Sequence, residues 1–208
     1  MKSEDFPKEG TDKATVDTYN SAAVAYEERY SGMGARIEDV ERGFSYSDSP
    51  EPSVVEIVCG NARDAEVILS RTGKYIGIDV SSSMIEFAQK NLPEAEFVVA
   101  DVVNYEFPKG IDIVFAFASF LHLDREKLKD VFKKIEVSLN ENGVLYLSLK
   151  RRDEYSSEVV SDEYGSRRFY YYSKTDILEL KPTTLREVYY DEQSHGGDEW
   201  LTLVLQKI

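Results

Sequence analysis

The residues from Ser53 to Ala65, SVVEIVCGNARDA, and from Tyr75 to Ser81, YIGIDVS, decide the fold that this sequence predicts. The first stretch opens with apolar, mostly β-branched residues, turns at Cys59-Gly60-Asn61 and continues with a helical spacing of apolar side chains. It therefore predicts a strand, a tight turn and a helix. The second stretch predicts another strand, which ends at Asp79, about twenty residues after the turn.

A ligand site is expected where these two strands end. Consecutive parallel strands bring the loops that follow them to one edge of a sheet. The glycine at position 60 lets the backbone approach a ligand closely, and the carboxylate of Asp79 can accept hydrogen bonds from a diol. The spacing of Gly60 and Asp79 therefore indicates a nucleoside site.

The same residues resemble the class I, Rossmann-like S-adenosylmethionine-dependent methyltransferases that act on small molecules. The first motif of that family is an acid followed by three alternating glycines. Glu56 matches the acid and Gly60 the middle glycine, while Val58 and Ala62 stand at the positions of the other two. The resemblance implies that S-adenosyl-L-methionine is the cofactor.

Further positions carry over from the family to this chain. Tyr19 and Tyr26 match two tyrosines of a helix that closes over the cofactor, and Asp101 matches an acid that accepts a hydrogen bond from adenine. Each tyrosine equally fits a buried helix face, Met84 fits a plain core position, and Asp101 fits a turn cap. The cofactor-binding residues that the resemblance implies are Tyr19, Tyr26, Glu56, Val58, Cys59, Gly60, Asp79, Val80, Met84, Asp101, Val102 and Ala118.

The rest of the chain predicts an α/β fold class: a single doubly wound, mostly parallel seven-stranded sheet with helices on both faces. Helical spacing runs from Thr11 to about Tyr30, which predicts an N-terminal helical cap. Ile111 to Leu121 is almost continuously apolar, which is typical of a strand buried on both faces, and we expect it beside the first strand. Thr184–Tyr190 and Trp200–Ile208 predict a final antiparallel hairpin.

One domain accounts for the length and composition of the chain. The expected organisation is a polar N-terminal arm at residues 1–10 and a class I methyltransferase domain at 11–208, with the cap at 11–45 and the Rossmann-like core at 53–208. The 208 residues contain one cysteine, Cys59, which excludes an internal disulfide and fits a reducing cytoplasm. We expect a cytoplasmic protein, since the sequence shows no secretory signal and no membrane span.

The charge of the chain limits its partners. A formal net charge of −14 and a pI near 4.7 argue against nucleic acid, because phosphate backbones are bound by basic faces. A small-molecule substrate is therefore expected, with no nucleic-acid or membrane partner. The sequence determines neither the acceptor nor the oligomeric state.

The chemistry implied by the resemblance is in-line attack by an acceptor atom on the sulfonium methyl, for which the protein aligns the reactants and excludes water. No metal is expected, since the sequence has no cysteine pair and no paired histidines. His122 and Tyr171 are candidates for a catalytic role. His122 equally fits a structural cap of the helix that opens at Asp124, and Tyr171 belongs to the cluster Arg167–Tyr172, which resembles an acceptor-pocket wall of small-molecule relatives.

Two other functions fit parts of the sequence. Gly60-x-Ala62-x-x-Ala65 with Asp79 is a degraded dinucleotide fingerprint, which would suit an NAD(P)-dependent oxidoreductase. Such an enzyme would continue with strand-helix-strand units, whereas this chain predicts a terminal hairpin. The branched side chain of Val58, where the family brings backbone against the cofactor, would suit a non-catalytic module that kept the fold.

Overall fold

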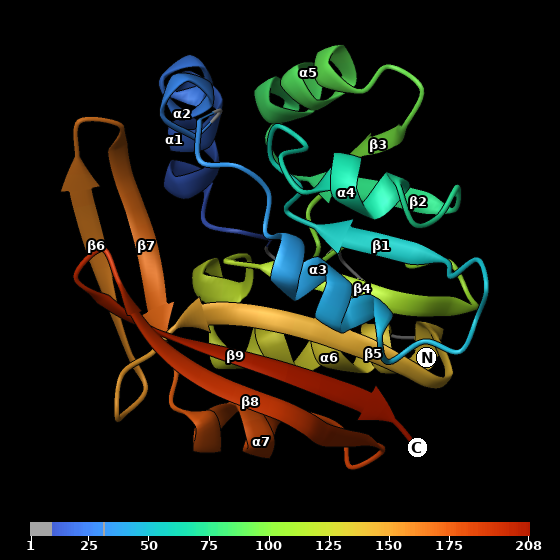
Figure 1. Ribbon diagram of the computed structural model, residues 1–208. Coiled ribbons are helices and arrows are strands. Elements are labelled where there is room, and N and C mark those ends of the chain that lie inside the picture. Colours follow the sequence, from blue (N-terminus) through green and yellow to red (C-terminus); the bar gives the residue numbers. More distant parts are fainter. Residues whose placement is uncertain (1–9, 31) are drawn as a thin grey trace, which may run out of the picture.

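The centre of the molecule is a seven-stranded sheet. The computed structural model of the chain describes residues 10–30 and 32–208, so the predicted N-terminal arm lies outside the described residues except for Gly10. The strands of this sheet are β1 (Val54–Ile57), β2 (Tyr75–Asp79), β3 (Glu96–Val99), β4 (Ile111–Phe117), β5 (Leu139–Lys150), β8 (Leu185–His195) and β9 (Asp198–Lys207). Their order is β3-β2-β1-β4-β5-β9-β8 (Figure 1).

The strand directions confirm the predicted fold class. β1 pairs in parallel with both β2 and β4, and parallel pairing continues to β3 on one side and β5 on the other. β9 is antiparallel to β5 and to β8, which finishes the sheet with the expected hairpin. Strands β2 and β3 therefore lie on one side of β1, whereas β4 and β5 lie on the other. In α/β sheets a ligand-binding crevice forms where the strand order reverses in this way, here between β1 and β4.

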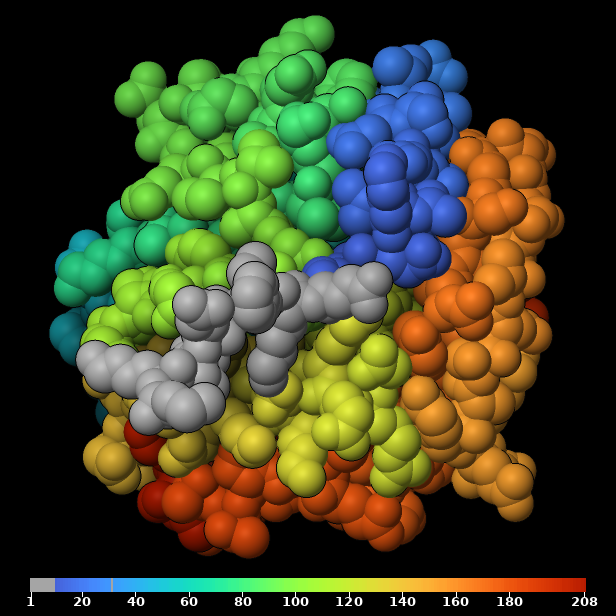
Figure 2. Space-filling model, turned by 180° about the vertical axis from the view of Figure 1, so that it is seen from behind, coloured from blue at the N-terminus to red at the C-terminus, as the bar shows by residue number. Residues whose placement is uncertain are grey.

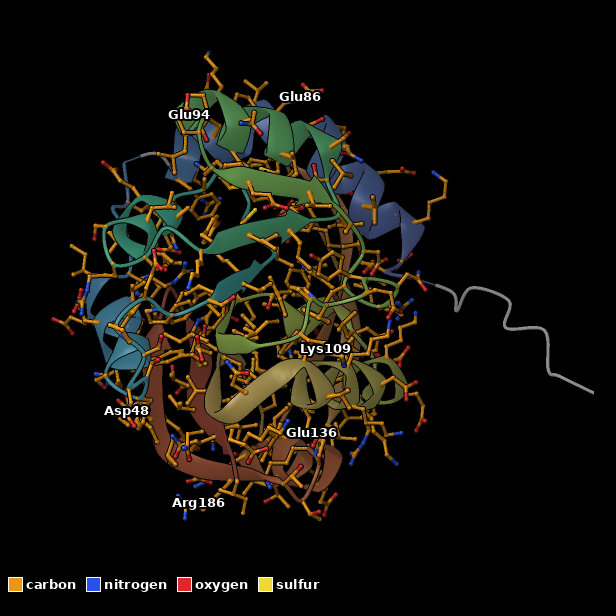
Figure 3. All side chains as sticks on the ribbon, turned by 90° about the vertical axis from the view of Figure 1, so that its right-hand side faces the viewer. Asp48, Glu86, Glu94, Lys109, Glu136 and Arg186 are labelled. Carbon is orange, nitrogen blue, oxygen red and sulfur yellow. The ribbon has the colours of Figure 1, made fainter. Side chains whose placement is uncertain are left out.

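Helices cover both faces of the sheet, as predicted. They are α1 (Lys13–Ser21), α2 (Ala23–Tyr30), α3 (Ile37–Phe44), α4 (Ala65–Leu69), α5 (Ser82–Asn91), the short 3₁₀ helix η1 (Phe120–His122), α6 (Arg125–Ser138) and α7 (Lys174–Leu180). On one face Phe132 of α6 and Ile177 of α7 belong to the larger core cluster. On the other face Val40 of α3 and Ile68 of α4 belong to the second. Charged side chains such as Glu86 lie at the outside of these layers (Figure 3).

The N-terminal cap consists of two helices, α1 and α2, where the sequence predicted one helix to about Tyr30. The helix breaks at Ala22, whose N–H bonds to the carbonyl of Thr18 and whose ψ is 10°. Next to this break, the hydroxyl of Ser21 donates to the carbonyl oxygens of Asp17 and Thr18. A hydroxyl that bonds back to the preceding turn competes with the helix ladder and bends it.

A separate two-stranded sheet, the β6–β7 hairpin (Ser156–Asp162 and Gly165–Tyr171), was not expected from the sequence. It stands beside the cap, and Figure 2 shows the blue residues of α1 between the green part of the sheet layer and the orange hairpin. Thr18 of α1 donates its hydroxyl to the carbonyl of Ser166, and the hydroxyl of Thr15 accepts the N–H of Arg168. The cap and the hairpin are thus joined by hydrogen bonds from α1.

Candidate functional site

A cavity of about 110 Å³ lies under the cap, at the carboxyl ends of β1, β2 and β4. Its wall consists of Thr11, Thr15, Tyr19, Ile57, Val58, Gly60, Ile78, Asp79, Val80, Met84, Ala100, Val102, Ala118, Ser119, His122 and Leu123. Most of these side chains are apolar. Asp79 is the only carboxylate among them and lies where β2 ends, whereas Ser119 and His122 follow β4.

The carboxylate of Asp79 is buried and held by backbone. It accepts N–H groups from Gly60 at 3.0 Å and from Ser81 at 2.8 Å. Burial raises the pKa of Asp79 to about 6, while these backbone bonds favour its charged form. The hydroxyl of Ser81 in turn accepts the N–H of Met84 and caps α5. The loops after β1 and β2 are thereby fixed to one carboxylate at the edge of the cavity.

The turn after β1 contains strained backbone. Val58 has φ of 59° and Ala62 has φ of 67°, in the left-handed region that glycine adopts freely. A β-branched residue is a clear outlier there, and such strain costs about 1–3 kcal/mol. The side chain of Val58 is part of the wall and 38% exposed, and the cavity beside Gly60 is not filled by it.

Glu56 lies behind the turn and is not part of the cavity wall. Its buried carboxyl group accepts the hydroxyl of Tyr75 at 2.5 Å. Burial, and then the neighbouring charge of Asp64, raise the pKa of Glu56 to about 8. Asp64 is itself held by the backbone N–H and the guanidinium of Arg36, at 2.7 and 2.6 Å. In this structure Glu56 contacts side chains that support the turn, and its predicted contact with a cofactor stays a prediction.

The carboxylate of Asp101 is hydrogen-bonded to Thr11 at the start of the cap. It accepts the N–H of Thr11 at 2.6 Å, the Thr11 hydroxyl at 3.3 Å and the N–H of Val103 at 3.0 Å. A Cβ atom at Gly10 would lie 2.4 Å from the same carboxylate, so a larger residue there would require this side chain to shift. The structure thus places Val102 in the cavity wall but not Asp101, which fastens the cap over the cavity.

The cavity wall also carries a hydrogen-bonded pair, Tyr19 and His122. His122 Nδ1 lies 2.7 Å from the carbonyl oxygen of Arg168, so Nδ1 holds the proton and Nε2 accepts the Tyr19 hydroxyl at 2.9 Å. Burial lowers the pKa of His122 to about 4 against the opposing effect of this carbonyl, and the imidazole is neutral at pH 7. His122 ends η1, and Asp124 itself caps α6 through the N–H of Lys127.

Three further predicted residues lie outside the wall. Tyr26 packs behind Tyr19, with ring centroids 5.3 Å apart, and accepts a hydrogen bond from Arg167. Cys59 is buried beside Gly60, and burial raises the pKa of its thiol. Tyr171 is buried against Leu121 and Phe169. Their predicted roles stay predictions.

Thr11, Thr15 and Ser119 line the cavity but were not among the predicted site residues. The sequence holds a pattern that indicates two of them. Thr15 precedes Tyr19 by four residues and so shares its helix face, and Ser119 directly follows Ala118, which was assigned. Thr11 reaches the wall through its contact with Asp101, ninety positions away, which no local pattern reveals.

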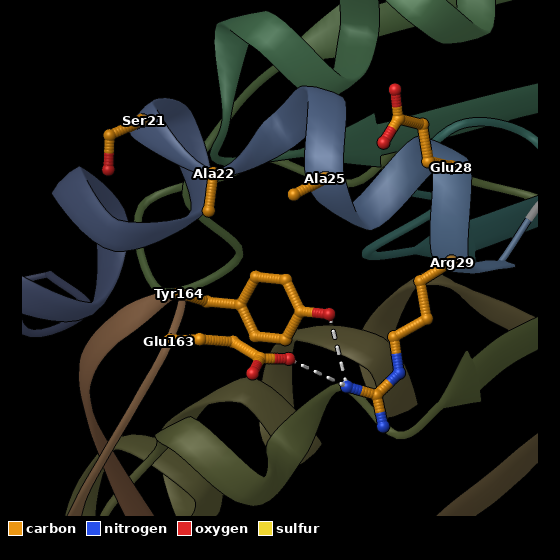
Figure 4. A pocket seen from close by; sticks show the side chains of 7 residues that line it. All are labelled: Ser21, Ala22, Ala25, Glu28, Arg29, Glu163 and Tyr164. Carbon is orange, nitrogen blue, oxygen red and sulfur yellow. Dashed lines mark hydrogen bonds and ion pairs between the residues drawn. The ribbon is translucent and has the colours of Figure 1, made fainter.

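A second, open hollow of about 670 Å³ lies on the outer side of the cap, against the turn between β6 and β7. Figure 4 shows Arg29 of α2 reaching across it toward the hairpin. Its guanidinium donates to the hydroxyl of Tyr164 at 3.1 Å and lies 4.0 Å from the carboxylate of Glu163. Arg29 therefore links the cap to the β6–β7 hairpin on the outer side of the cap as well.

The described residues contain neither a metal-binding cluster nor a membrane-spanning helix. Between residues 10 and 208, residue 31 apart, no group of three or more His, Cys, Asp or Glu side chains could hold a metal ion. No helix in the described part of the chain is long and apolar enough to cross a membrane.

Comparison with known proteins gives matches to methyltransferases. Residues 54–143 match the family model described as "Methyltransferase domain". Trans-aconitate 2-methyltransferase of Afipia carboxidovorans is 35% identical over 98 residues, which cover 46% of this chain and 38% of that protein. Malonyl-[acyl-carrier protein] O-methyltransferase 1 of Ilyobacter polytropus is 28% identical over 118 residues, or 54% of this chain and 44% of that protein. The chain therefore spans less than half the length of these two relatives.

Solved structures share the whole fold. Magnesium protoporphyrin IX methyltransferase from Synechocystis PCC 6803, solved with bound S-adenosylmethionine, superposes with a TM-score of 0.72 at 14% identity. The superposition covers 93% of this chain and 95% of that one. At this level of identity the likeness concerns the fold.

The raised pKa of Glu56 predicts a pH-dependent stability. The folded state holds the proton up to a pH of about 8, whereas the unfolded chain releases it near the ordinary value of 4.5. Stability is therefore lost as pH rises between these values, by roughly 1 kcal/mol per pH unit from this group. Glu56→Gln, which keeps a neutral partner for Tyr75, should remove this part of the slope in urea unfolding from pH 5 to 8.

Glu51→Gln is the matched control, since Glu51 is exposed and pairs with Lys74 at the surface. This variant should retain the pH dependence of the unchanged protein. Equal slopes in all three proteins would show that Glu56 is ionised in the folded state.

Proposed function

We propose that this chain, which its domain match and fold place among the class I S-adenosylmethionine-dependent methyltransferases, transfers a methyl group to a small-molecule acceptor by in-line displacement. One observation carries the proposal. The wall of one cavity combines the buried carboxylate of Asp79 with the polar side chains of Tyr19, Ser119 and His122. A ligand whose nucleoside is held by Asp79 would have these polar groups within the same cavity.

The side chains that line the cavity fit S-adenosylmethionine in their chemistry. Asp79 can accept from a ribose diol, and its two backbone bonds keep the carboxylate in place. Apolar side chains around it, including Ile78, Met84 and Val102, suit the faces of a purine. When bound, S-adenosylmethionine supplies a methyl group already activated on a sulfonium. Asp79, and with it Gly60 and Val80 of the adjoining loops, would hold its nucleoside.

The small size of the cavity supports a movement of the cap. Sites for ligands of this size have volumes of about 300–1,000 Å³, several times the 110 Å³ found here. Thr11, Thr15 and Tyr19 all come from the cap segment and close the cavity on one side. We propose that the cap moves outward to admit the cofactor and then excludes water from it, which strengthens the electrostatic interactions inside.

A small acceptor agrees with the relatives and with the charge of the chain. The curated relatives are named for methylation of trans-aconitate and of a carrier-bound malonyl group. The net charge of −14 opposes binding of a long polyanion such as nucleic acid. No residue is required to activate the methyl donor, so the role of this chain is to align the acceptor with it.

Equilibrium titration tests the proposal against its rivals. The protein should bind S-adenosylmethionine in calorimetry and show no binding of NAD. Binding of NAD instead would support the oxidoreductase, and binding of neither would support a non-catalytic module. Incubation of the protein with S-adenosylmethionine and small organic acceptors, followed by assay of S-adenosylhomocysteine, tests transfer itself.

Asp79→Ala should weaken binding of S-adenosylmethionine more than about tenfold, or roughly 1.4 kcal/mol, because it removes a charge-assisted hydrogen bond to the ribose. Calorimetry on the folded variant measures the change. Asp48→Ala is the control, since Asp48 is exposed at the outside of the molecule (Figure 3) and should leave the affinity unchanged. Equal affinity of the two variants would reject the role given to Asp79.

Val58→Gly should bind S-adenosylmethionine as tightly as the unchanged protein or several-fold more tightly. Glycine adopts the φ of 59° without strain and leaves more room beside the cofactor. Ala62→Gly is the matched control, because Ala62 has a similar φ but lies outside the cavity wall. Loss of binding in Val58→Gly alone would show that the valine side chain is itself a ligand contact.

A further inference from the structure

We propose that two side chains of the cap, Asn20 of α1 and Glu27 of α2, are positioning residues for the cofactor. Each holds one of the two loops whose backbone N–H groups fix the carboxylate of Asp79. The inference rests on the proposed function and adds that the cap also prepares Asp79 for the nucleoside. Two separate chains of contacts support it, one for each oxygen of that carboxylate.

The first chain of contacts runs from Asn20 to Asp79 through Ser81. The side-chain oxygen of Asn20 accepts the Ser81 hydroxyl at 2.8 Å, and the Ser81 N–H donates to Asp79 Oδ1 at 2.8 Å. Ser81 is 0% exposed, and its hydroxyl oxygen already accepts the N–H of Met84. Without Asn20 this buried hydroxyl would lose its acceptor, which is costly, so Asn20 fixes the orientation of Ser81.

The second chain of contacts runs from Glu27 to the other oxygen of Asp79. The side-chain amide of Asn61 donates to the carboxylate of Glu27 at 2.5 Å. Asn61 directly follows Gly60, whose N–H donates to Asp79 Oδ2 at 3.0 Å. The carbonyl oxygen of Asn61 also accepts the side-chain amide of Asn91, the last residue of α5, at 3.1 Å. Glu27 therefore holds the turn from the cap, while Asn91 holds it from α5.

The turn after β1 depends on contacts from outside because its backbone is strained. Val58 and Ala62, which flank this turn, both have positive φ. Strained backbone persists only where the surrounding structure determines it. On the side where a Cβ atom would lie, Gly60 meets no atom within 4 Å, so packing does not hold this residue there. The hydrogen bond between Asn61 and Glu27 supplies a restraint that packing does not.

The cap directs these two side chains toward the loops of the sheet. Thr18 and Tyr26, in contrast, bond to the β6–β7 hairpin, and the cap lies between α5 and this hairpin (Figure 1). Neither Asn20 nor Glu27 belongs to the cavity wall, so each acts on a ligand through the loop that it holds. The position of the cap and the position of Asp79 are therefore coupled.

Calorimetric titration with S-adenosylmethionine tests Asn20. Asn20→Ala should raise the dissociation constant about threefold to tenfold, because the Ser81 hydroxyl loses its acceptor. Asn20→Asp should bind within about twofold of the unchanged protein, since a carboxylate oxygen also accepts this hydroxyl and is favoured at the start of α5. Asp17→Ala is the matched control and should leave the affinity unchanged, since Asp17 lies on the same helix and pairs with Lys13 at the surface.

The same substitution in an Asp79→Ala background separates positioning from a general structural role. If Asn20 acts through Asp79, Asn20→Ala should then change the dissociation constant by less than about twofold, because the group that it positions is gone. A role in holding the cap alone would weaken binding equally in both backgrounds. Urea unfolding of each variant confirms that it is folded under the conditions of the titration.

Glu27 has its own test at the other oxygen of Asp79. Glu27→Ala and Asn61→Ala should each raise the dissociation constant about threefold, because they remove the same hydrogen bond. The double variant should lie within about twofold of the weaker single variant. Glu27→Gln, which keeps an acceptor oxygen, should recover part of the loss. Val24→Ala is the control, since Val24 is 62% exposed on the same helix.

The outcomes separate the two proposals. If the unchanged protein binds S-adenosylmethionine, an unchanged affinity in Asn20→Ala and in Glu27→Ala overturns the positioning inference and leaves the proposed function standing. An equal loss of affinity from Asn20→Ala with and without Asp79 also overturns it. A protein that does not bind S-adenosylmethionine overturns the proposed function and the inference with it.

Discussion

The buried carboxylate of Asp79 is the group on which the geometry of the site depends. It accepts N–H groups from Gly60 and Ser81, and so joins the loops that follow β1 and β2. Without these bonds two backbone donors and a carboxylate would be buried without partners, which is costly for each. The same arrangement leaves the carboxylate in the cavity wall, where it can still accept from a ligand. Local folding and ligand recognition therefore use one side chain.

The parts of this structure that follow from local sequence were predictable. The strand order near β1 follows from the spacing of Gly60 and Asp79 and from the continuous apolar run of β4. The helix caps are local as well, since the hydroxyls of Ser81 before α5 and Ser173 before α7 accept N–H groups three residues further on. In each case residues within one or two turns of the chain determine the outcome, so the periodicity and the cap residues carry the information.

The parts that could not be predicted depend on distant contacts. β6 is a strand without a fully buried residue, and its sequence lacks the apolar alternation that marks a half-buried strand. It forms because β7 pairs with it and because Thr15 and Thr18 of α1 bond to the β7 backbone. Asp101 accepts the N–H of Thr11, ninety positions away in the chain. A sequence pattern gives the position of such a residue at a strand end but not its partner.

The cap is attached in a way that suits a moving element. The only buried residues of α1 are Thr15 and Thr18, and each makes a hydrogen bond to the hairpin backbone. A typical hydrogen bond contributes a net of about 1 kcal/mol, whereas burial of a large apolar side chain contributes about 1.5–3 kcal/mol. A helix held largely by such hydrogen bonds, which also join Tyr19 to His122 and Asn20 to Ser81, can therefore open at lower free energy than one held by a wide apolar face. This agrees with a cavity that is smaller than its proposed ligand.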